Sequence, residues 1–160
     1  MIEKSETLKA WAAGVFDGEG TALISEVMKG TNYQLLVCVT NNDRAMIDVF
    51  WNNWADDAEK EPYTAVSWKK TRRVALNAGG AEQVIFDYPD AEQLLEDLLP
   101  YLVTKRMNAL VLLSALKSIK SRAASFSGSN QPVNGTIADI LKPLFIEYHH
   151  LWSRKTHLSK

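Results

Sequence analysis

Apolar residues follow two different spacings along this chain. In five stretches they recur every three to four positions, which is typical of amphipathic helices. In four shorter runs they are rich in β-branched residues or alternate with polar residues, which is typical of strands. The expected helices cover about 6–17, 43–54, 90–100, 104–116 and 136–152, and the expected strands about 21–28, 33–40, 63–70 and 84–88. The pattern predicts an α+β chain of order α-β-β-α-β-β-α-α, with a further helix at the end.

Local signals place the ends of these elements. Ser5 is a suitable N-cap for the first helix, and the glycines of residues 17–20 (DGEG) are expected to stop that helix in a sharp turn. Residues 29–32 (KGTN) lie between the first two strands, which predicts a β-hairpin. In the second strand, alternating apolar residues predict one face against a core and one partly polar face.

Length and composition set the class of protein. With 160 residues, 46% of them hydrophobic, the chain is expected to form a single domain (1–160), with a core at about 5–120 and a helical tail at about 136–155. Its single cysteine, Cys38, excludes a disulfide framework and favours an intracellular location. No apolar run is long enough for a membrane span. The sequence has no phosphate-binding glycine loop and no zinc motif, and we expect no small-molecule substrate.

Charge is distributed unevenly although the net charge is only −1. Residues 56–61 carry a net −3 and residues 82–97 a net −6, so the rest of the chain carries +8. Basic residues are concentrated in two places. One is a cluster of Lys69, Lys70, Arg72 and Arg73, and the other is a stretch without acids from 98 to 138, which contains Lys105, Arg106, Lys117, Lys120 and Arg122. This asymmetry predicts one basic face suited to nucleic acid, with ordinary solvated charge runs as the alternative.

Three short segments resemble one protein family. Residues 12–20 (AAGVFDGEG) resemble the LAGLIDADG motif, residues 100–106 (PYLVTKR) resemble a Pro-aromatic-Leu-x-x-Lys element, and residues 39–41 (VTN) resemble a strand end that carries a polar active-site residue. The chain is thus similar, over about residues 8–116, to LAGLIDADG homing endonucleases of the single-motif kind. The resemblance implies the αββαββα fold of that family, with an antiparallel DNA-binding sheet and, here, extra C-terminal helices.

The same resemblance implies an activity and its residues. A homodimer would cut both strands of DNA at a long, partly palindromic site and leave staggered ends. Glu19 and the Gly18 carbonyl would bind Mg²⁺, which prefers such oxygen ligands, while Mn²⁺ or Ca²⁺ could substitute in binding. Asp17, the first acid of the motif, is the less favoured ligand because in the family it helps to shape the helix end.

Two further residues match polar positions of the family's active site. Lys105 resembles the basic residue near the scissile phosphate and its water, with a solvated lysine at a helix start as the alternative. Asn41 resembles the water-positioning residue, with a cap for the following helix as the alternative. A family arginine expected four residues later falls on Ala45, and the neighbouring Arg44 is the candidate for the same phosphate.

The motif helix is expected to form the dimer contact. Small residues at positions 13 and 14 allow two such helices to approach closely, and a single motif per chain requires a second chain. The candidate interface residues are Trp11, Ala12, Ala13, Gly14 and Phe16. The alternative is that this helix packs only against the core of its own chain.

Alternation along the strands, counted from Glu19, gives the candidate DNA-reading residues. They are Thr21, Leu23 and Ser25 on the first strand, Asn32, Gln34, Leu36 and Cys38 on the second, and Lys69, Lys70, Arg72, Arg73 and Arg44 as basic contacts. Two other functions stay open from the sequence: a DNA- or RNA-binding relative without catalysis, such as a maturase or regulator, and a structural dimer with no nucleic-acid role.

Overall fold

The computed structural model describes residues 3–28, 32–55, 70–76, 78–125 and 134–152. The helices are α1 (Glu6–Glu19), α2 (Arg44–Trp54), α3 (Tyr88–Leu98), α4 (Arg106–Ser125), α5 (Asn134–Glu147) and α6 (His149–Trp152), with short 3-10 turns η2 (Ala78–Gly80) and η3 (Leu99–Tyr101). The strands are β1 (Gly20–Met28), β2 (Asn32–Asn41), β3 (Arg72–Ala75) and β4 (Glu82–Ile85). The predicted α+β class and the order αββαββα with additional C-terminal helices are confirmed.

The four strands form one antiparallel sheet in the order β1-β2-β4-β3. The predicted hairpin of β1 and β2 is its longest pairing, with Gly20 opposite Val39 and Ile24 opposite Leu35. Strand β4 pairs with β2 from the other side, and β3 forms the far edge. Because paired residues share a face of a sheet, this register fixes which side chains point together.

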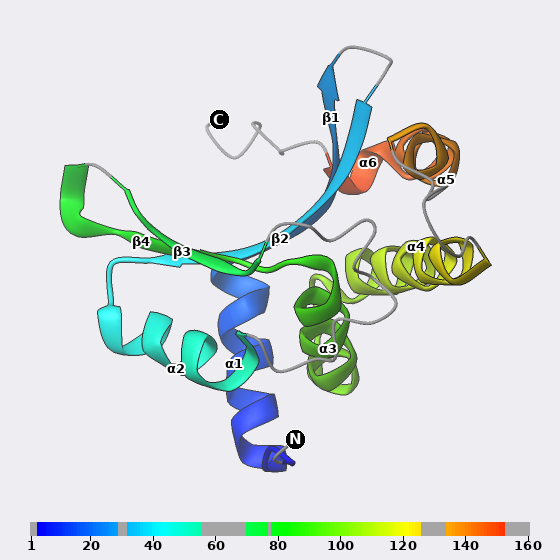
Figure 1. The fold of residues 1–160 in the computed structure, drawn as a ribbon. Helices are drawn as coiled ribbons and strands as arrows, with labels where there is room; N and C mark the ends of the chain where they lie inside the picture. Colours follow the sequence, from blue (N-terminus) through cyan, green and yellow to red (C-terminus); the bar gives the residue numbers. More distant parts are fainter. Residues whose placement is uncertain (1–2, 29–31, 56–69, 77, 126–133, 153–160) are drawn as a thin grey trace.

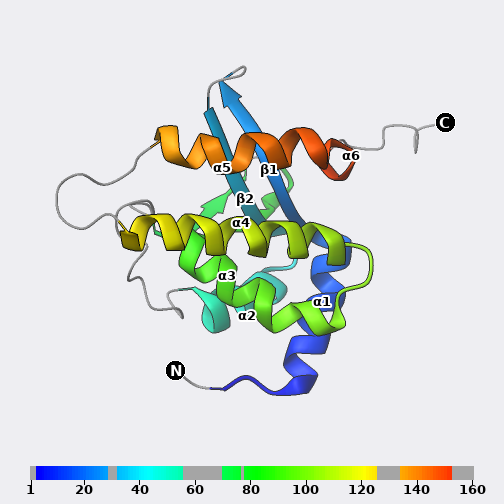
Figure 2. The same ribbon diagram turned by 90° about the vertical axis from the view of Figure 1, so that its right-hand side faces the viewer.

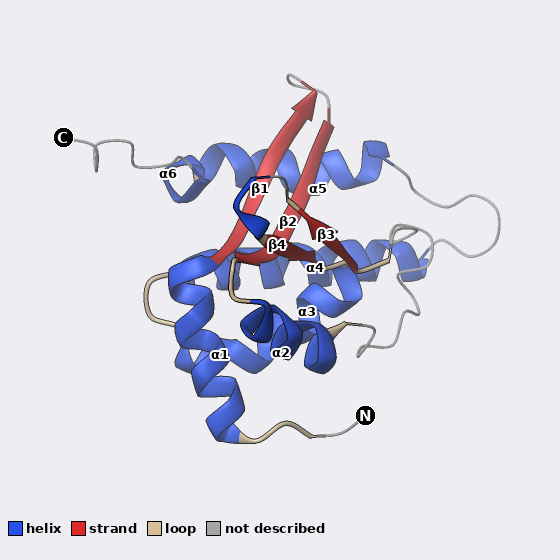
Figure 3. Ribbon diagram, turned by 90° about the vertical axis from the view of Figure 1, so that its left-hand side faces the viewer, coloured by secondary structure: helices blue, strands red, loops and turns tan. Residues whose placement is uncertain are grey.

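The described helices all lie on one side of this sheet. Figure 1 shows α1 to α6 below and beside the curved strands, and the opposite views agree, with α4 and α5 in front of the strands in Figure 2 and behind them in Figure 3. The core between the two layers contains Val37 and Val39 of β2 and Val84 of β4. From the helices it contains Leu94, Leu95 and Leu98 of α3 and Leu112, Leu113 and Leu116 of α4. The other face of the sheet is left bare by the described part of the chain.

Helix α1 begins as predicted but ends later. Ser5 accepts a hydrogen bond from the backbone of Leu8 and caps the start. The helix then continues through Gly18 to Glu19 and has Gly20 as its C-cap, so residues 17–20 end it as predicted. It ends two residues later than expected and passes directly into β1 instead of making a sharp turn. At the junction, Gly20 has an extended backbone, and a Cβ there would collide with the ring of Phe16. Glycine is needed at residue 20 for close approach, not for a turn.

The second strand pair is displaced from its expected position. Strand β3 lies at 72–75, after the expected 63–70, and residues 63–69 of that expectation lie outside the described residues. Gly79 and Gly80, at φ 88° and 72°, make the turn into β4, as residues with no Cβ readily do. Helix α3 begins at Tyr88 with Asp87 as N-cap, because Pro89 is well suited to the first turn.

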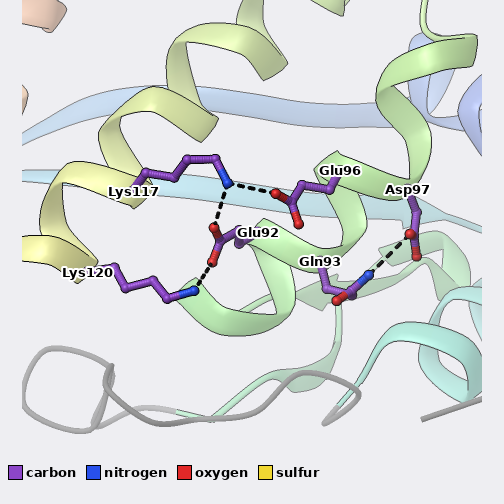
Figure 4. A network of polar contacts seen from close by, with 6 residues as sticks. All are labelled: Glu92, Gln93, Glu96, Asp97, Lys117 and Lys120. Atoms are coloured by element: carbon purple, nitrogen blue, oxygen red, sulfur yellow. Dashed lines mark hydrogen bonds and ion pairs between the residues drawn. The ribbon is translucent and has the colours of Figure 1, made fainter.

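Acidic residues of α3 neutralise part of the basic stretch on α4. Lys117 lies 3.2 Å from Glu92 and 2.7 Å from Glu96, and Lys120 lies 3.4 Å from Glu92 (Figure 4). Glu96 contributes most to raising the pKa of Lys117. The prediction that these lysines belong to one basic face was wrong, because they pair within the helical layer. None of the described helices is long and apolar enough to cross a membrane.

Candidate functional site

The bare face of the sheet contains the strand residues that alternation placed there. Thr21 lies opposite Cys38, Leu23 opposite Leu36, and Ser25 opposite Gln34. Asn32 belongs to the same alternating set on β2, beside an irregularity in the register of β1. The register adds residues of the other two strands, so that the bare face comprises Thr21, Leu23, Ser25, Asn32, Gln34, Leu36, Cys38, Thr40, Arg72, Val74, Gln83 and Ile85.

Cys38 is on this face but is covered by its neighbours. The Nε2 of Gln83 lies 3.0 Å from Thr40 Oγ1 and 3.5 Å from Cys38 Sγ, and only 2% of Cys38 is exposed. Burial raises the pKa of the Cys38 thiol, against the effect of its hydrogen bonds with Thr21 and Gln83. The prediction that Cys38 contacts DNA is therefore corrected: in this structure Gln83, an amide with donors and an acceptor, lies over it.

Sequence reasoning missed Gln83 because it placed the start of β4 two residues too late. Had the strand been taken from Glu82, alternation alone would have put Gln83 on the bare face together with Ile85. The amide of glutamine is suited to bidentate contact with adenine, so this omission concerned a chemically relevant side chain.

The five basic residues proposed for DNA contact lie in four different situations. Arg72 and Lys70 are exposed, and Arg72 shares the bare face with Ile85. Arg73 is on the helical side, 2.6 Å from both Glu82 and Asp48. Its role as a DNA contact is corrected, since α2 and β4 neutralise it.

Of the other two basic residues, Arg44 is described by the structure and Lys69 is not. Arg44 is 77% exposed at its side chain and lies 3.4 Å from Glu82, so it extends from the start of α2 toward an acid instead of standing alone. Lys69 lies outside the described residues.

At the end of α1, Asp17 binds the segment that precedes α4. Its carboxylate accepts hydrogen bonds from the backbone N–H of Val103 at 2.8 Å, from Lys105 N–H at 2.9 Å and from Thr104 Oγ1 at 3.0 Å. Burial favours the neutral acid, but these hydrogen bonds outweigh it and hold the pKa of Asp17 below its usual value. The motif's first acid therefore joins α1 to residues 103–105.

Lys105 lies beside both acids of the motif. Its Nζ donates to the main-chain carbonyl of Asp17 at 2.6 Å, and it experiences the negative charge of Glu19. Burial lowers the pKa of the ammonium, and the charges of Asp17 and Glu19 only partly offset this. The structure thus brings together Glu19 and Lys105, which are 86 residues apart in the chain.

Asn41 lies at the end of β2, two residues beyond the partner of Gly20, near the same junction. Its Oδ1 accepts the backbone N–H of Asp43 at 2.7 Å, and Asp43 in turn caps α2 through Ala45 N–H. The side-chain oxygen of Asn41 therefore supports the start of α2, as the capping alternative predicted. The amide nitrogen of Asn41 is the part of the side chain left for a catalytic role.

The two faces of α1 have different environments. Ala12, Ala13 and Phe16 are fully buried in the core of their own chain, which corrects their assignment to a dimer contact. Trp11 is 41% exposed and Gly14 is exposed, as is Gly18 one turn further on. A Cβ added at Gly14 or Gly18 would meet nothing within 4 Å.

The oxygen atoms at this helix end fit part of a metal site. Glu19 is exposed, and the last carbonyls of a helix, that of Gly18 among them, lack partners within the helix. Magnesium is commonly held by one or two carboxylates together with water and substrate phosphates. Within the described residues, no three His, Cys, Asp or Glu side chains are grouped so as to hold a metal ion. One chain therefore offers an incomplete set of hard oxygen ligands.

Comparison with known proteins identifies the fold. No protein-family model and no curated protein matches the sequence. Among solved structures, the homing endonuclease I-CvuI in complex with its target matches at a TM-score of 0.50, with 18% identity over 87% of this chain and 95% of that chain. The archaeal intron-encoded homing endonuclease I-Vdi141I, complexed with DNA, matches at 0.51, with 8% identity over 89% and 99%. The chain has the fold of homing endonucleases, as the resemblance of residues 12–20 implied.

Proposed function

We propose that this chain is a LAGLIDADG homing endonuclease that cuts double-stranded DNA as a homodimer. The observation that carries the proposal is the junction of α1 and β1, where the Lys105 ammonium binds the carbonyl of Asp17, two residues before Glu19, next to a bare antiparallel sheet. The two structural relatives named above are DNA endonucleases with the same fold, and one of them is complexed with DNA. The reaction would be metal-dependent hydrolysis of one phosphodiester in each strand, leaving staggered ends.

The exposed face of α1 supports a homodimer. Glycine inside a helix costs about 1 kcal/mol relative to alanine. Among the described residues, nothing requires the absence of a side chain at Gly14 or Gly18, because both positions border open space there. A second α1 packed closely against this face would explain both glycines and would cover Trp11.

A two-fold axis through paired α1 helices would complete the metal site. It would bring two Glu19 carboxylates and two Gly18 carbonyls together at the helix ends, where the described part of one chain offers a single copy of each. A divalent ion such as Mg²⁺ held there would stabilise the leaving oxygen and favour a water nucleophile.

Lys105 and Asn41 would act on the groups around the cleaved phosphate. The Lys105 ammonium has three donors, of which the carbonyl of Asp17 takes one, so two remain for a phosphate oxygen whose negative charge grows in the transition state. The amide nitrogen of Asn41 would orient a water molecule, while its oxygen holds the start of α2.

The bare face would read the DNA. A twisted antiparallel sheet fits the major groove, where Gln34 and Gln83 are suited to adenine and Leu23 and Leu36 to thymine methyl groups. Arg72 and Lys70 would supply contacts to phosphate or guanine. Two such sheets in a dimer would recognise a long and partly palindromic site.

The experiment is selection of bound DNA from a randomised double-stranded library, followed by incubation of the recovered sequences with Mg²⁺. The proposal predicts a preferred site with partial two-fold symmetry, cut in both strands with offset breaks. Cleavage of no sequence, with binding intact, would contradict it.

One observation favours a second function, a DNA- or RNA-binding relative without catalysis. Ala45 occupies the position where the family resemblance implies an arginine, and the neighbouring Arg44 pairs with Glu82. Under this alternative, the chain would bind nucleic acid with an affinity that Glu19→Gln leaves unchanged, and it would cut nothing.

A further inference from the structure

Asp17 is attached to three consecutive residues that precede α4. One carboxylate oxygen accepts the N–H of Val103, and the other accepts both the N–H of Lys105 and the hydroxyl of Thr104. The partners lie 86 to 88 residues further along the chain. Both oxygens of the acid are therefore engaged, and three donors occupy most of its roughly four lone-pair positions, which makes the carboxylate a poor candidate for a metal ligand.

The main-chain carbonyl of Asp17 binds the side-chain ammonium of Lys105. The carbonyl accepts Lys105 Nζ at 2.6 Å and Thr104 Oγ1 at 3.3 Å. This carbonyl belongs to the last turn of α1, where carbonyls have no intrahelical partner and the helix dipole attracts a cation. A single residue thus fixes both the backbone and the ammonium of Lys105.

This double attachment limits the freedom of a long side chain. A lysine has four rotatable side-chain bonds, and holding it in one geometry costs up to about 2 kcal/mol of conformational entropy. Lys105 is half-buried against the end of α1 and lies in the field of Glu19. With the segment 103–105 already held, much of this ordering is complete before any substrate arrives.

We infer that Asp17 is a positioning residue for DNA cleavage: it ties the segment 103–105 to the end of α1 and so keeps the Lys105 ammonium beside Glu19. The inference rests on the proposed function, because it assigns a role in that reaction. The motif's two acids then have separate tasks. Glu19 is left for a metal ion, and Asp17 acts through Lys105 without contacting metal or DNA.

The test is a double-mutant cycle on the full-length chain with a DNA site selected as above. Single-turnover cleavage rates in Mg²⁺ are compared for wild type, Asp17→Asn, Lys105→Met and the double variant, with DNA affinity measured in Ca²⁺. In Asp17→Asn an NH₂ group replaces one acceptor and faces an N–H donor. The expected result is a cleavage rate about 10- to 100-fold lower, with affinity unchanged, and no further loss when Asp17→Asn is added to Lys105→Met.

Two results would overturn the inference. One is an Asp17→Asn variant that cuts as fast as wild type. The other is an equal loss from Asp17→Asn with and without Lys105, which is the behaviour of a residue that only supports the fold. If the wild type cuts no DNA at all, the proposed function fails first, so the two failures are distinguishable.

A milder variant keeps the test decisive if Asp17→Asn does not fold. Thr104→Val removes only the hydroxyl, which contacts the carboxylate and carbonyl of Asp17, and leaves both backbone hydrogen bonds in place. It is expected to lower the cleavage rate severalfold, and this effect should vanish in the Lys105→Met background. A rate equal to wild type, or an effect that persists without Lys105, would count against the role of Asp17.

Discussion

Arg72 and Arg73 are adjacent in the sequence but lie on opposite faces of the sheet. Arg72 is opposite Ile85 on the bare face, whereas Arg73 is opposite the buried Val84 and reaches Glu82 and Asp48 on the helical side. Two residues of the same type in one basic cluster therefore have different electrostatic roles. The first is exposed on the bare face, and the second links β3 to β4 and α2.

This difference predicts opposite effects of two matched substitutions. Arg72→Ala should weaken DNA binding and reduce the slope of log affinity against log salt by about 2, as expected for the loss of one phosphate contact from each protomer of the homodimer. Arg73→Ala should leave that slope unchanged but lower the free energy of unfolding by about 1 kcal/mol, because Glu82 and Asp48 each lose an ion pair. DNA titrations at several salt concentrations and urea unfolding would measure the two effects. A salt slope that falls in Arg73→Ala and stays unchanged in Arg72→Ala would show that the bare face is not the DNA face.

The exposed side of α1 gives a second matched pair. Gly14→Leu places a side chain in open space within one chain but inside the proposed dimer contact. We expect a folded monomer by sedimentation velocity under conditions in which the wild type is a dimer. Ala13→Leu is the control, since Ala13 is fully buried and overpacking should cost about 1–3 kcal/mol of folding stability. A Gly14→Leu protein with unchanged dimerisation would rule out this face.

The attachment of Asp17 predicts a pH dependence of stability. Its pKa is below the ordinary value of 3.8 in the folded chain, so the unfolded chain takes up the proton at a higher pH. The stabilisation from this carboxylate is therefore complete above pH 3.8 and is lost as the pH falls through the lower folded value. Urea unfolding of wild type and Asp17→Asn between about pH 3 and 6 should show a difference that shrinks at the acidic end. A difference that stays constant would contradict this account.

Local periodicity predicted the parts of the site that depend on neighbouring residues. Alternation along β1 and β2 placed Thr21, Leu23, Gln34 and Leu36 on one face, and the register agrees because a strand alternates strictly. The apolar repeat predicted a helix over about 43–54, and α2 covers Arg44–Trp54 with Asp43 as its N-cap. In both cases the deciding contacts lie within a few residues.

Long-range contacts decided what the sequence did not reveal. The glycines of residues 17–20 end α1 but make no sharp turn: the helix runs through Gly18 and passes directly into β1, and Gly20 packs closely against the ring of Phe16. Asp17 finds its donors 86 to 88 residues away, and Arg73 reaches Asp48 across 25 residues. The side of α1 that is buried also follows from packing: the pattern of small residues at 12–14 fits either face, and tertiary contacts bury Ala12 and Ala13 and leave Gly14 exposed.

The central claim is that Glu19 holds the metal for DNA cleavage. The most direct measurement compares wild type and Glu19→Gln on the selected site, in Mg²⁺ and in EDTA, with DNA affinity measured separately in Ca²⁺. The account predicts that wild type cuts both strands only with the metal, and that Glu19→Gln still binds the site but cuts at least about 100-fold more slowly. Cleavage by Glu19→Gln at the wild-type rate, above all if Asp17→Asn abolished cutting, would contradict it.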